Sequence, residues 1–140
     1  GFDDVVIGAP YRDGDNGAVY VVYGPGIGSN SVAQANISLL PHENHTLLGS
    51  NVWVVDLDQD GALDVAASAP NADTQLPRTG SVLGIHGPLG AAENFDWVLY
   101  SSDTGDHLAD SLLPTDSGFV LGSARRATGN GGLMWVEWSP

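Results

Sequence analysis

The sequence predicts an all-β protein built from repeated four-stranded antiparallel units, and three observations lead to this fold class. Short segments rich in Val, Ile, Tyr and Trp alternate with turns rich in Gly, Pro, Asn and Asp, a pattern typical of strands rather than helices. The chain also repeats itself at an interval of about sixty residues. Its 19 glycines and 8 prolines suit a protein with many tight turns. Helix content should be close to zero.

Two segments of the sequence recur. Residues 1–10 align without a gap with residues 61–70, sharing Gly, Asp, Val, Ala and Pro at matching positions. Residues 17–25 align with 80–88 and again with 132–140, and each copy begins at Gly and ends at Pro. The copies predict about two and a half units. These are a partial unit at 1–47, a full unit at 48–100 and a degenerate partial unit at 101–140.

The strand pattern can be followed along the whole chain. Strands are expected near residues 4–9, 18–23, 36–40, 49–55, 63–69, 81–86, 95–100, 106–112, 119–123 and 133–138. Residues 13–17, Asp-Gly-Asp-Asn-Gly, predict a hairpin turn before the second strand rather than a cation site. The tryptophans fall within the expected strands, where packing between neighbouring units is their expected role. They are Trp53, Trp97, Trp135 and Trp138.

An acidic stretch, residues 56–64, carries Asp at its positions 1, 3, 5 and 9 and glycine at position 6. Calcium takes about six to eight hard oxygen ligands, so a tight loop that turns alternate side chains inward can hold it. Gly61 should take the sharp turn, while Leu57 and Leu63 should anchor the loop in the core. An EF-hand would need Glu at position 12, which is Ala67. The predicted ligands are the carboxylates of Asp56, Asp58, Asp60 and Asp64 and the backbone carbonyl of Ala62.

The other two copies of this loop differ from it. The first copy starts at its glycine, so only the carbonyl of Phe2 and the carboxylate of Asp4 remain as candidate ligands for a second metal. In the third copy Ser111, Leu113 and Thr115 take the alternating positions. Because these residues offer no carboxylate, no metal is expected there.

Charge and composition narrow the classes of partner. The formal net charge of −13 comes from 17 acidic residues against four basic ones, all of them arginine. This excess disfavours nucleic acids and anionic lipid, so cations are the expected counterparts. The sequence lacks an apolar run long enough to span a bilayer, and no membrane insertion is expected. Without cysteine, disulfides and thiolate sites are excluded.

Histidines and sequons are the remaining candidates for chemistry. Asn36 and Asn44 begin Asn-x-Ser/Thr sequons, and Asn44, in an expected turn between units, is the better glycan acceptor. The histidines lack the spacing of a zinc site or of a base beside a nucleophile. A surface or strand-filling role is expected for them, and the chain is not expected to be an enzyme. They are His42, His45, His86 and His107.

Three motifs, at residues 56–64, 5–10 and 17–24, resemble the FG-GAP repeats of integrin α-subunits and related surface proteins. The resemblance implies a β-propeller in which each repeat forms one blade and a calcium loop joins its first two strands. A closed ring needs more blades than this chain supplies. Missing chain or neighbouring subunits are therefore expected to complete it.

The same resemblance implies a function. It points to an extracellular or cell-surface scaffold or adhesion module, stabilised by calcium, without catalytic activity of its own and with a protein or glycan partner. Two alternatives stay open. One is a subunit of a self-assembling fibre or filament, a homo-oligomer that uses open β-edges. The other is the accessory propeller of a secreted hydrolase such as a phospholipase, which needs a separate catalytic domain.

Overall fold

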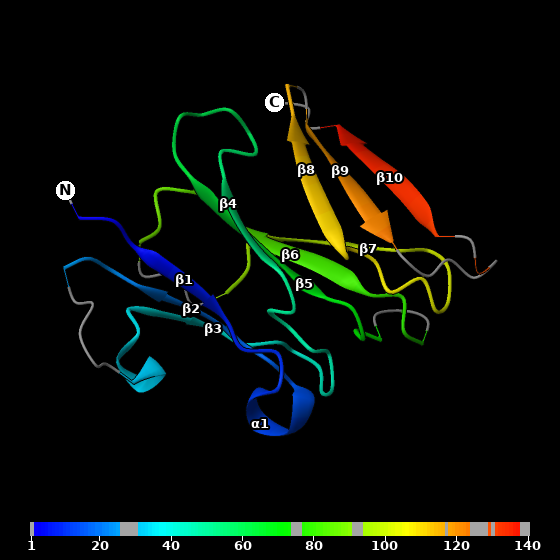
Figure 1. Cartoon of the computed structure of the whole chain (residues 1–140), viewed down its shortest axis with the longest axis horizontal. Helices are drawn as coiled ribbons and strands as arrows, with labels where there is room; N and C mark the ends of the chain where they lie inside the picture. The colour runs from blue at the N-terminus through cyan, green and yellow to red at the C-terminus, as the bar shows by residue number, and fades with distance from the viewer. Residues whose placement is uncertain are drawn as a thin grey trace.

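Three small antiparallel sheets lie side by side in the computed structural model (Figure 1). Their strand orders are β1-β2-β3, β4-β5-β6-β7 and β10-β9-β8. The structure describes residues 2–25, 31–73, 77–90, 94–116, 118–123, 129 and 131–137. The strands are β1 (Val5–Gly8), β2 (Val19–Val22), β3 (Ile37–Leu39), β4 (Val52–Val55), β5 (Asp64–Ala69), β6 (Ser81–Ile85), β7 (Trp97–Tyr100), β8 (Ser111–Thr115), β9 (Gly118–Ser123) and β10 (Gly132–Glu137). The predicted all-β fold is confirmed, and the open sheets are consistent with partial propeller blades.

Two short helical segments lie in the connections of the first sheet. The four-residue segment α1 (Arg12–Asp15) joins β1 to β2, and the 3-10 turn η1 (Val32–Gln34) precedes β3. Within α1, Asp13 and Gly14 have left-handed backbone angles, with φ of 53° and 66°, so this segment is a wound turn rather than a regular helix. Among the described residues, neither segment approaches the length needed to cross a bilayer.

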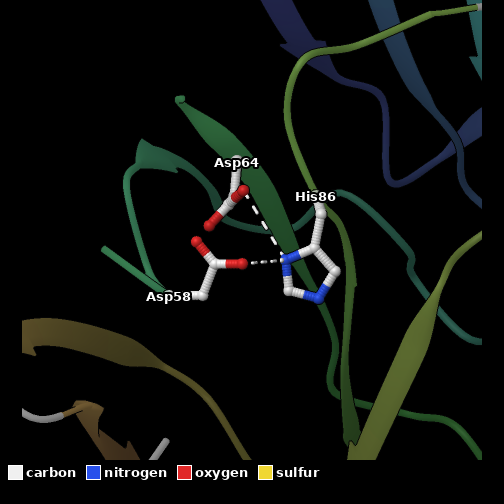
Figure 2. Close-up of side chains that lie close together, drawn as sticks. All are labelled: Asp58, Asp64 and His86. Carbon is white, nitrogen blue, oxygen red and sulfur yellow. Dashed lines mark ion pairs between the residues drawn. The ribbon is translucent and has the colours of Figure 1, made fainter. Parts of the chain in front are cut away.

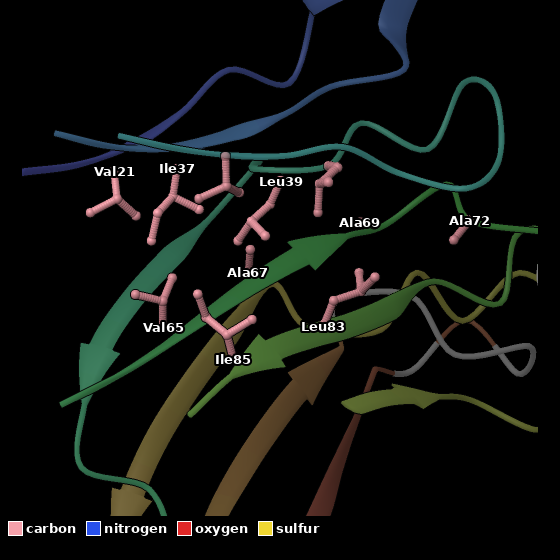
Figure 3. Close-up of a cluster of buried hydrophobic side chains, with 11 residues drawn as sticks. Val21, Ile37, Leu39, Val65, Ala67, Ala69, Ala72, Leu83 and Ile85 are labelled. Atoms are coloured by element: carbon pink, nitrogen blue, oxygen red, sulfur yellow. The ribbon is translucent and has the colours of Figure 1, made fainter. Parts of the chain in front are cut away.

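The middle sheet is covered on both faces. Strands β5 and β6 are buried along their whole length, because alternate side chains enter two different cores. On one face, Val65, Ala67 and Ile85 pack toward the first sheet. Figure 3 shows them opposite Ile37 and Leu39, which come from β3. This first core joins the sheet of β1–β3 to the sheet of β4–β7.

The opposite face of the middle sheet packs on the third sheet. Ala66 and Val82 share this second core with Phe119 of β9. The ring of Trp97 stacks on Phe119, with the ring centroids 6.0 Å apart and the planes inclined by 29°. A Cβ atom at Gly84 would lie 2.1 Å from the Trp97 ring. Glycine is therefore required where the indole crosses β6.

The largest error in the strand prediction concerns the segment 106–112. Strand β8 begins only at Ser111. His107 and Ala109 adopt left-handed backbone angles, with φ of 48° and 73°, which cannot continue a strand. Leu108 is only 2% exposed, so its apolar character reflects a loop that packs into the second core.

The packing role between neighbouring units stays a prediction for Trp135. Its side chain is 56% exposed, because it lies on the face of the third sheet that points away from the second core. It pairs with Val120, which pairs in turn with Leu113 on β8. Leu133 on the same strand is 77% exposed. Trp138 lies outside the described residues.

Candidate metal centre

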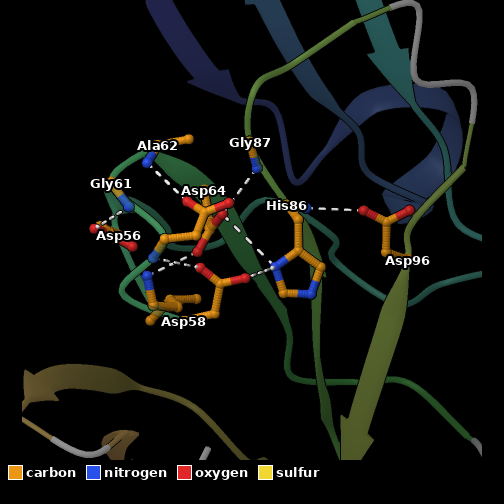
Figure 4. Close-up of polar contacts among 10 residues, drawn as sticks. Asp56, Asp58, Gly61, Ala62, Asp64, His86, Gly87 and Asp96 are labelled. Carbon is orange, nitrogen blue, oxygen red and sulfur yellow. Dashed lines mark hydrogen bonds and ion pairs between the residues drawn. The ribbon is translucent and has the colours of Figure 1, made fainter. Parts of the chain in front are cut away.

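The acidic loop connects β4 to β5, and its own side chains fold it tightly. Asp56 Oδ2 accepts a hydrogen bond from the backbone N–H of Gly61 (3.0 Å). Asp58 Oδ1 accepts one from Asp60 N–H (3.1 Å), and Asp60 Oδ1 accepts one from Ala62 N–H (2.7 Å). Figure 4 shows these contacts together. Gly61 has φ +92°, as the predicted sharp turn requires.

These turns bring three of the predicted ligands together. Asp56, Asp58 and Asp60 each offer an oxygen atom, and the three atoms lie within 4.8 Å of one another. Asp56 Oδ1 is buried and accepts no hydrogen bond from any residue that the structure describes. Burying an ionised oxygen without a partner is costly, and three close carboxylates repel one another. A hard cation such as calcium would relieve both costs.

Asp64, the first residue of β5, is completely buried. Its Oδ2 accepts a hydrogen bond from the backbone N–H of Leu57 (2.7 Å), and its Oδ1 accepts one from Gly87 N–H (2.8 Å). Asp64 therefore closes the acidic loop and fixes the end of β6 to it. The structure groups Asp64 with Asp58 and His86 rather than with Asp56 and Asp60.

His86 is the residue of this centre that sequence reasoning missed. Its Nδ1 atom lies 3.3 Å from Asp58 Oδ2 and 3.7 Å from Asp64 Oδ1. The histidine directly follows β6, and the register of β5 with β6 brings it to the loop. One signal was available in the sequence. The internal repeat aligns Gly87 with Gly24, so His86 stands directly before a glycine that both copies share.

The first sheet carries the matching contact of the first repeat. Asp4 Oδ1 accepts a hydrogen bond from Gly24 N–H at 2.9 Å, as Asp64 Oδ1 does from Gly87 N–H. This agreement supports the alignment of the two copies. Phe2 is 75% exposed. A metal held by Asp4 and the Phe2 carbonyl stays a prediction, as does the Ala62 carbonyl in the main loop.

Only one of the two leucines expected to anchor the loop does so. Leu57 is 2% exposed, whereas Leu63 is 59% exposed, so the prediction for Leu63 is wrong. Neighbouring side chains of an extended segment point in opposite directions. Because Asp64 points inward, Leu63 must point outward.

In the third sheet a hairpin replaces the loop. Ser111, Leu113 and Thr115, expected at the alternating loop positions, lie within β8 instead and pair with β9. Only residues 116 and 117 separate the two strands. The side chain of Gln59 donates a hydrogen bond to the backbone carbonyl of Asp116, so this hairpin braces the acidic loop.

A pocket of about 310 Å³ opens elsewhere, between residues 41–46 and strands β6 and β7. Its lining includes the carboxylates of Glu43 and Asp96. Glu43 accepts a hydrogen bond from the backbone N–H of Asp73 (3.1 Å), and Asp96 accepts one from His86 N–H (2.8 Å). Both carboxylates thus hold backbone segments in place.

Comparisons with known proteins show two similarities in sequence. Residues 1–22 match the model of the FG-GAP repeat family, described as "FG-GAP repeat". Integrin alpha-10 of Homo sapiens is 35% identical over 74 residues, which make up 51% of this chain. The chain spans 6% of the length of that integrin. The predicted resemblance to FG-GAP repeats is confirmed, and the similarity to an integrin α-subunit is distant and partial.

Proposed function

We propose that this chain, which carries an FG-GAP repeat at residues 1–22, is a calcium-stabilised scaffold or adhesion module of an extracellular protein, with no catalytic activity of its own. The observation that carries the proposal is the convergence of Asp56, Asp58 and Asp60 around a buried Asp56 oxygen that lacks a donor among the described residues. These residues would hold the ion through carboxylate oxygens, the ligands that calcium prefers.

A structural role for the ion follows from the place of the loop. The loop joins β4 to β5, and Leu57 within it belongs to the second core. Gln59 links it to the hairpin between β8 and β9. An ion at this point would neutralise the loop carboxylates and so stabilise the contact between the middle and third sheets.

Calcium is expected to raise the melting temperature of the chain. An ion that binds only the folded state at about one hundred times its Kd adds about 2.7 kcal/mol, which corresponds to a rise in Tm of about 5–15 °C for a domain of this size. Asp60→Asn should lose most of this rise, because it removes one ligand charge while its amide oxygen can still accept from Ala62 N–H. Thermal melts in calcium and in chelator measure the effect.

The control for that experiment is Asp103→Asn, which removes the same charge at an exposed position outside the acidic loop. It should keep the full response to calcium. If the unaltered chain melts at one temperature in calcium and in chelator, the calcium site is refuted. An equal loss of response in both variants would point to net charge rather than to a site.

The extracellular location rests on the partial similarity to an integrin α-subunit, and it predicts that a sequon of the chain carries a glycan. Asn36 and Asn44 are both exposed. Asn36 Oδ1 accepts a hydrogen bond from Tyr23 N–H at 2.8 Å, while a glycan would be attached to the amide nitrogen. When the chain is expressed through a eukaryotic secretory pathway, peptide mass spectrometry should find a glycan at Asn44. Asn44→Gln should remove it, and an unmodified secreted Asn44 would contradict the prediction.

A further inference from the structure

A second group of ligand atoms lies beside the calcium loop, and it contains a nitrogen. Asp58, Asp64 and His86 each offer one ligand atom, and all three atoms lie within 4.8 Å of one another. Figure 2 shows the two carboxylates and the imidazole pointing toward one another from three segments of the chain. The residues come from the acidic loop, the start of β5 and the position directly after β6.

The three side chains are held in place by contacts outside the group. Asp64 is completely buried and accepts two backbone hydrogen bonds. The backbone N–H of His86 donates to Asp96 Oδ2 at 2.8 Å. The side chains of His86 and Asp58 remain 30% and 22% exposed. The group is therefore preorganised on its inner side and open to solvent on its outer side.

The identity of the ligand atoms distinguishes this group from the calcium loop. Calcium binds oxygen, whereas imidazole nitrogen suits zinc and neighbouring transition metals. Around a tetrahedral zinc with bonds of about 2.0–2.1 Å, neighbouring ligand atoms lie about 3.4 Å apart. The Nδ1 atom of His86 lies 3.3 Å and 3.7 Å from the two carboxylate oxygens. These separations fit such an ion.

The first repeat shows that the fold itself does not demand a histidine here. Tyr23 holds the corresponding position, since its backbone N–H donates to Asn36 as that of His86 donates to Asp96. The Tyr23 hydroxyl donates instead to the carbonyls of Leu89 and Gly90. An aromatic ring is thus compatible with this position, and the imidazole nitrogen is particular to His86.

We infer that Asp58, Asp64 and His86 form a site for a transition-metal dication of the zinc class, next to the calcium loop. The site rests on the proposed function, because Asp58 belongs to both groups of ligands and Asp64 is also one of the predicted calcium ligands. With its ring proton on Nε2, His86 supplies the Nδ1 lone pair, and the two carboxylates supply charge. Two open positions on the solvent side complete the shell with water.

Cobalt(II) is the probe, because its absorption spectrum reports nitrogen ligation, and competition with zinc then gives the zinc affinity. The whole 140-residue chain should bind one Co²⁺ at Asp58, Asp64 and His86, and His86→Gln should weaken that binding at least tenfold. Calcium affinity should change less than twofold in the same variant. His42→Gln, at an exposed histidine, is the matched control and should bind Co²⁺ as the unaltered chain does.

A second variant excludes misfolding as the cause of lost Co²⁺ binding. His86→Tyr places the residue of the first repeat at this position, so it should fold and still lose Co²⁺ binding. Co²⁺ affinity equal to that of the unaltered chain in either His86 variant overturns the inference. Asp60→Asn separates the two sites, because it should weaken calcium binding and leave Co²⁺ binding intact. If calcium does not bind while histidine-dependent Co²⁺ binding persists, the calcium proposal fails and this inference stands.

Discussion

Asp64→Ala is expected to lower the free energy of unfolding by about 2–6 kcal/mol even without any metal. The substitution leaves the buried N–H of Leu57 and the partly buried N–H of Gly87 without the carboxylate to which they donate, and a donor left without a partner away from water costs about 1–3 kcal/mol. Domains of this kind are stable by about 5–15 kcal/mol in total. Denaturant unfolding in chelator measures this loss separately from any effect of calcium.

A second variant separates the role of Asp64 as a hydrogen-bond acceptor from its predicted role as a calcium ligand. Asp60→Ala removes an exposed carboxylate whose partner, the N–H of Ala62, is also exposed, so it should change metal-free stability by less than about 1 kcal/mol. Both variants should reduce the response to calcium. If Asp64→Ala unfolds in chelator at the same denaturant concentration as the unaltered chain, the two backbone hydrogen bonds do not stabilise the loop as the structure indicates.

Phe119→Ala is expected to lower the free energy of unfolding by about 3–5 kcal/mol, the usual cost of removing a buried phenylalanine. Phe119 is 1% exposed and belongs to the core between the middle and third sheets. The substitution also removes the stacking contact with Trp97. Because Trp97 lies over Gly84, its fluorescence should shift to longer wavelength as water reaches the vacated space.

The matched control is Leu113→Ala on the neighbouring strand, where the side chain is 65% exposed. It should cost less than about 1 kcal/mol. Phe119→Leu keeps most of the buried volume and should fall between the two alanine variants. Equal stability of Phe119→Ala and Leu113→Ala would mean that the second and third sheets are not held together by this core.

Much of the fold follows from local properties of the sequence. Strand segments are visible because β-branched and aromatic residues alternate with glycine and proline turns, and these are properties of neighbouring residues. The acidic loop is visible for the same reason, since Asp56, Asp58, Asp60 and Gly61 act within one turn of chain. The repeat correctly pairs Asp4 with Asp64, because each accepts the N–H of a glycine that follows an equivalent strand, β2 in the first sheet and β6 in the middle sheet.

The prediction failed where strand formation or side-chain burial depends on contacts with residues that are distant in the sequence. Leu108 is apolar and is expected in a strand, but it lies buried in a loop. Ser111, Leu113 and Thr115 are expected in a third copy of the acidic loop, but they lie in β8. Leu63 is apolar yet exposed. Which face of a strand is covered depends on the neighbouring sheet, and periodicity along one strand does not specify that.

The sequence by itself determined the all-β repeat and the convergence of Asp56, Asp58 and Asp60 in one loop, because both depend on short-range patterns. Only the tertiary structure brought His86 to Asp58 and Asp64 and gave Asp64 its two backbone donors. The physical reason is register: the pairing of β5 with β6 sets which residue after β6 meets the loop. A shift of one residue would turn that side chain to the other face of the sheet.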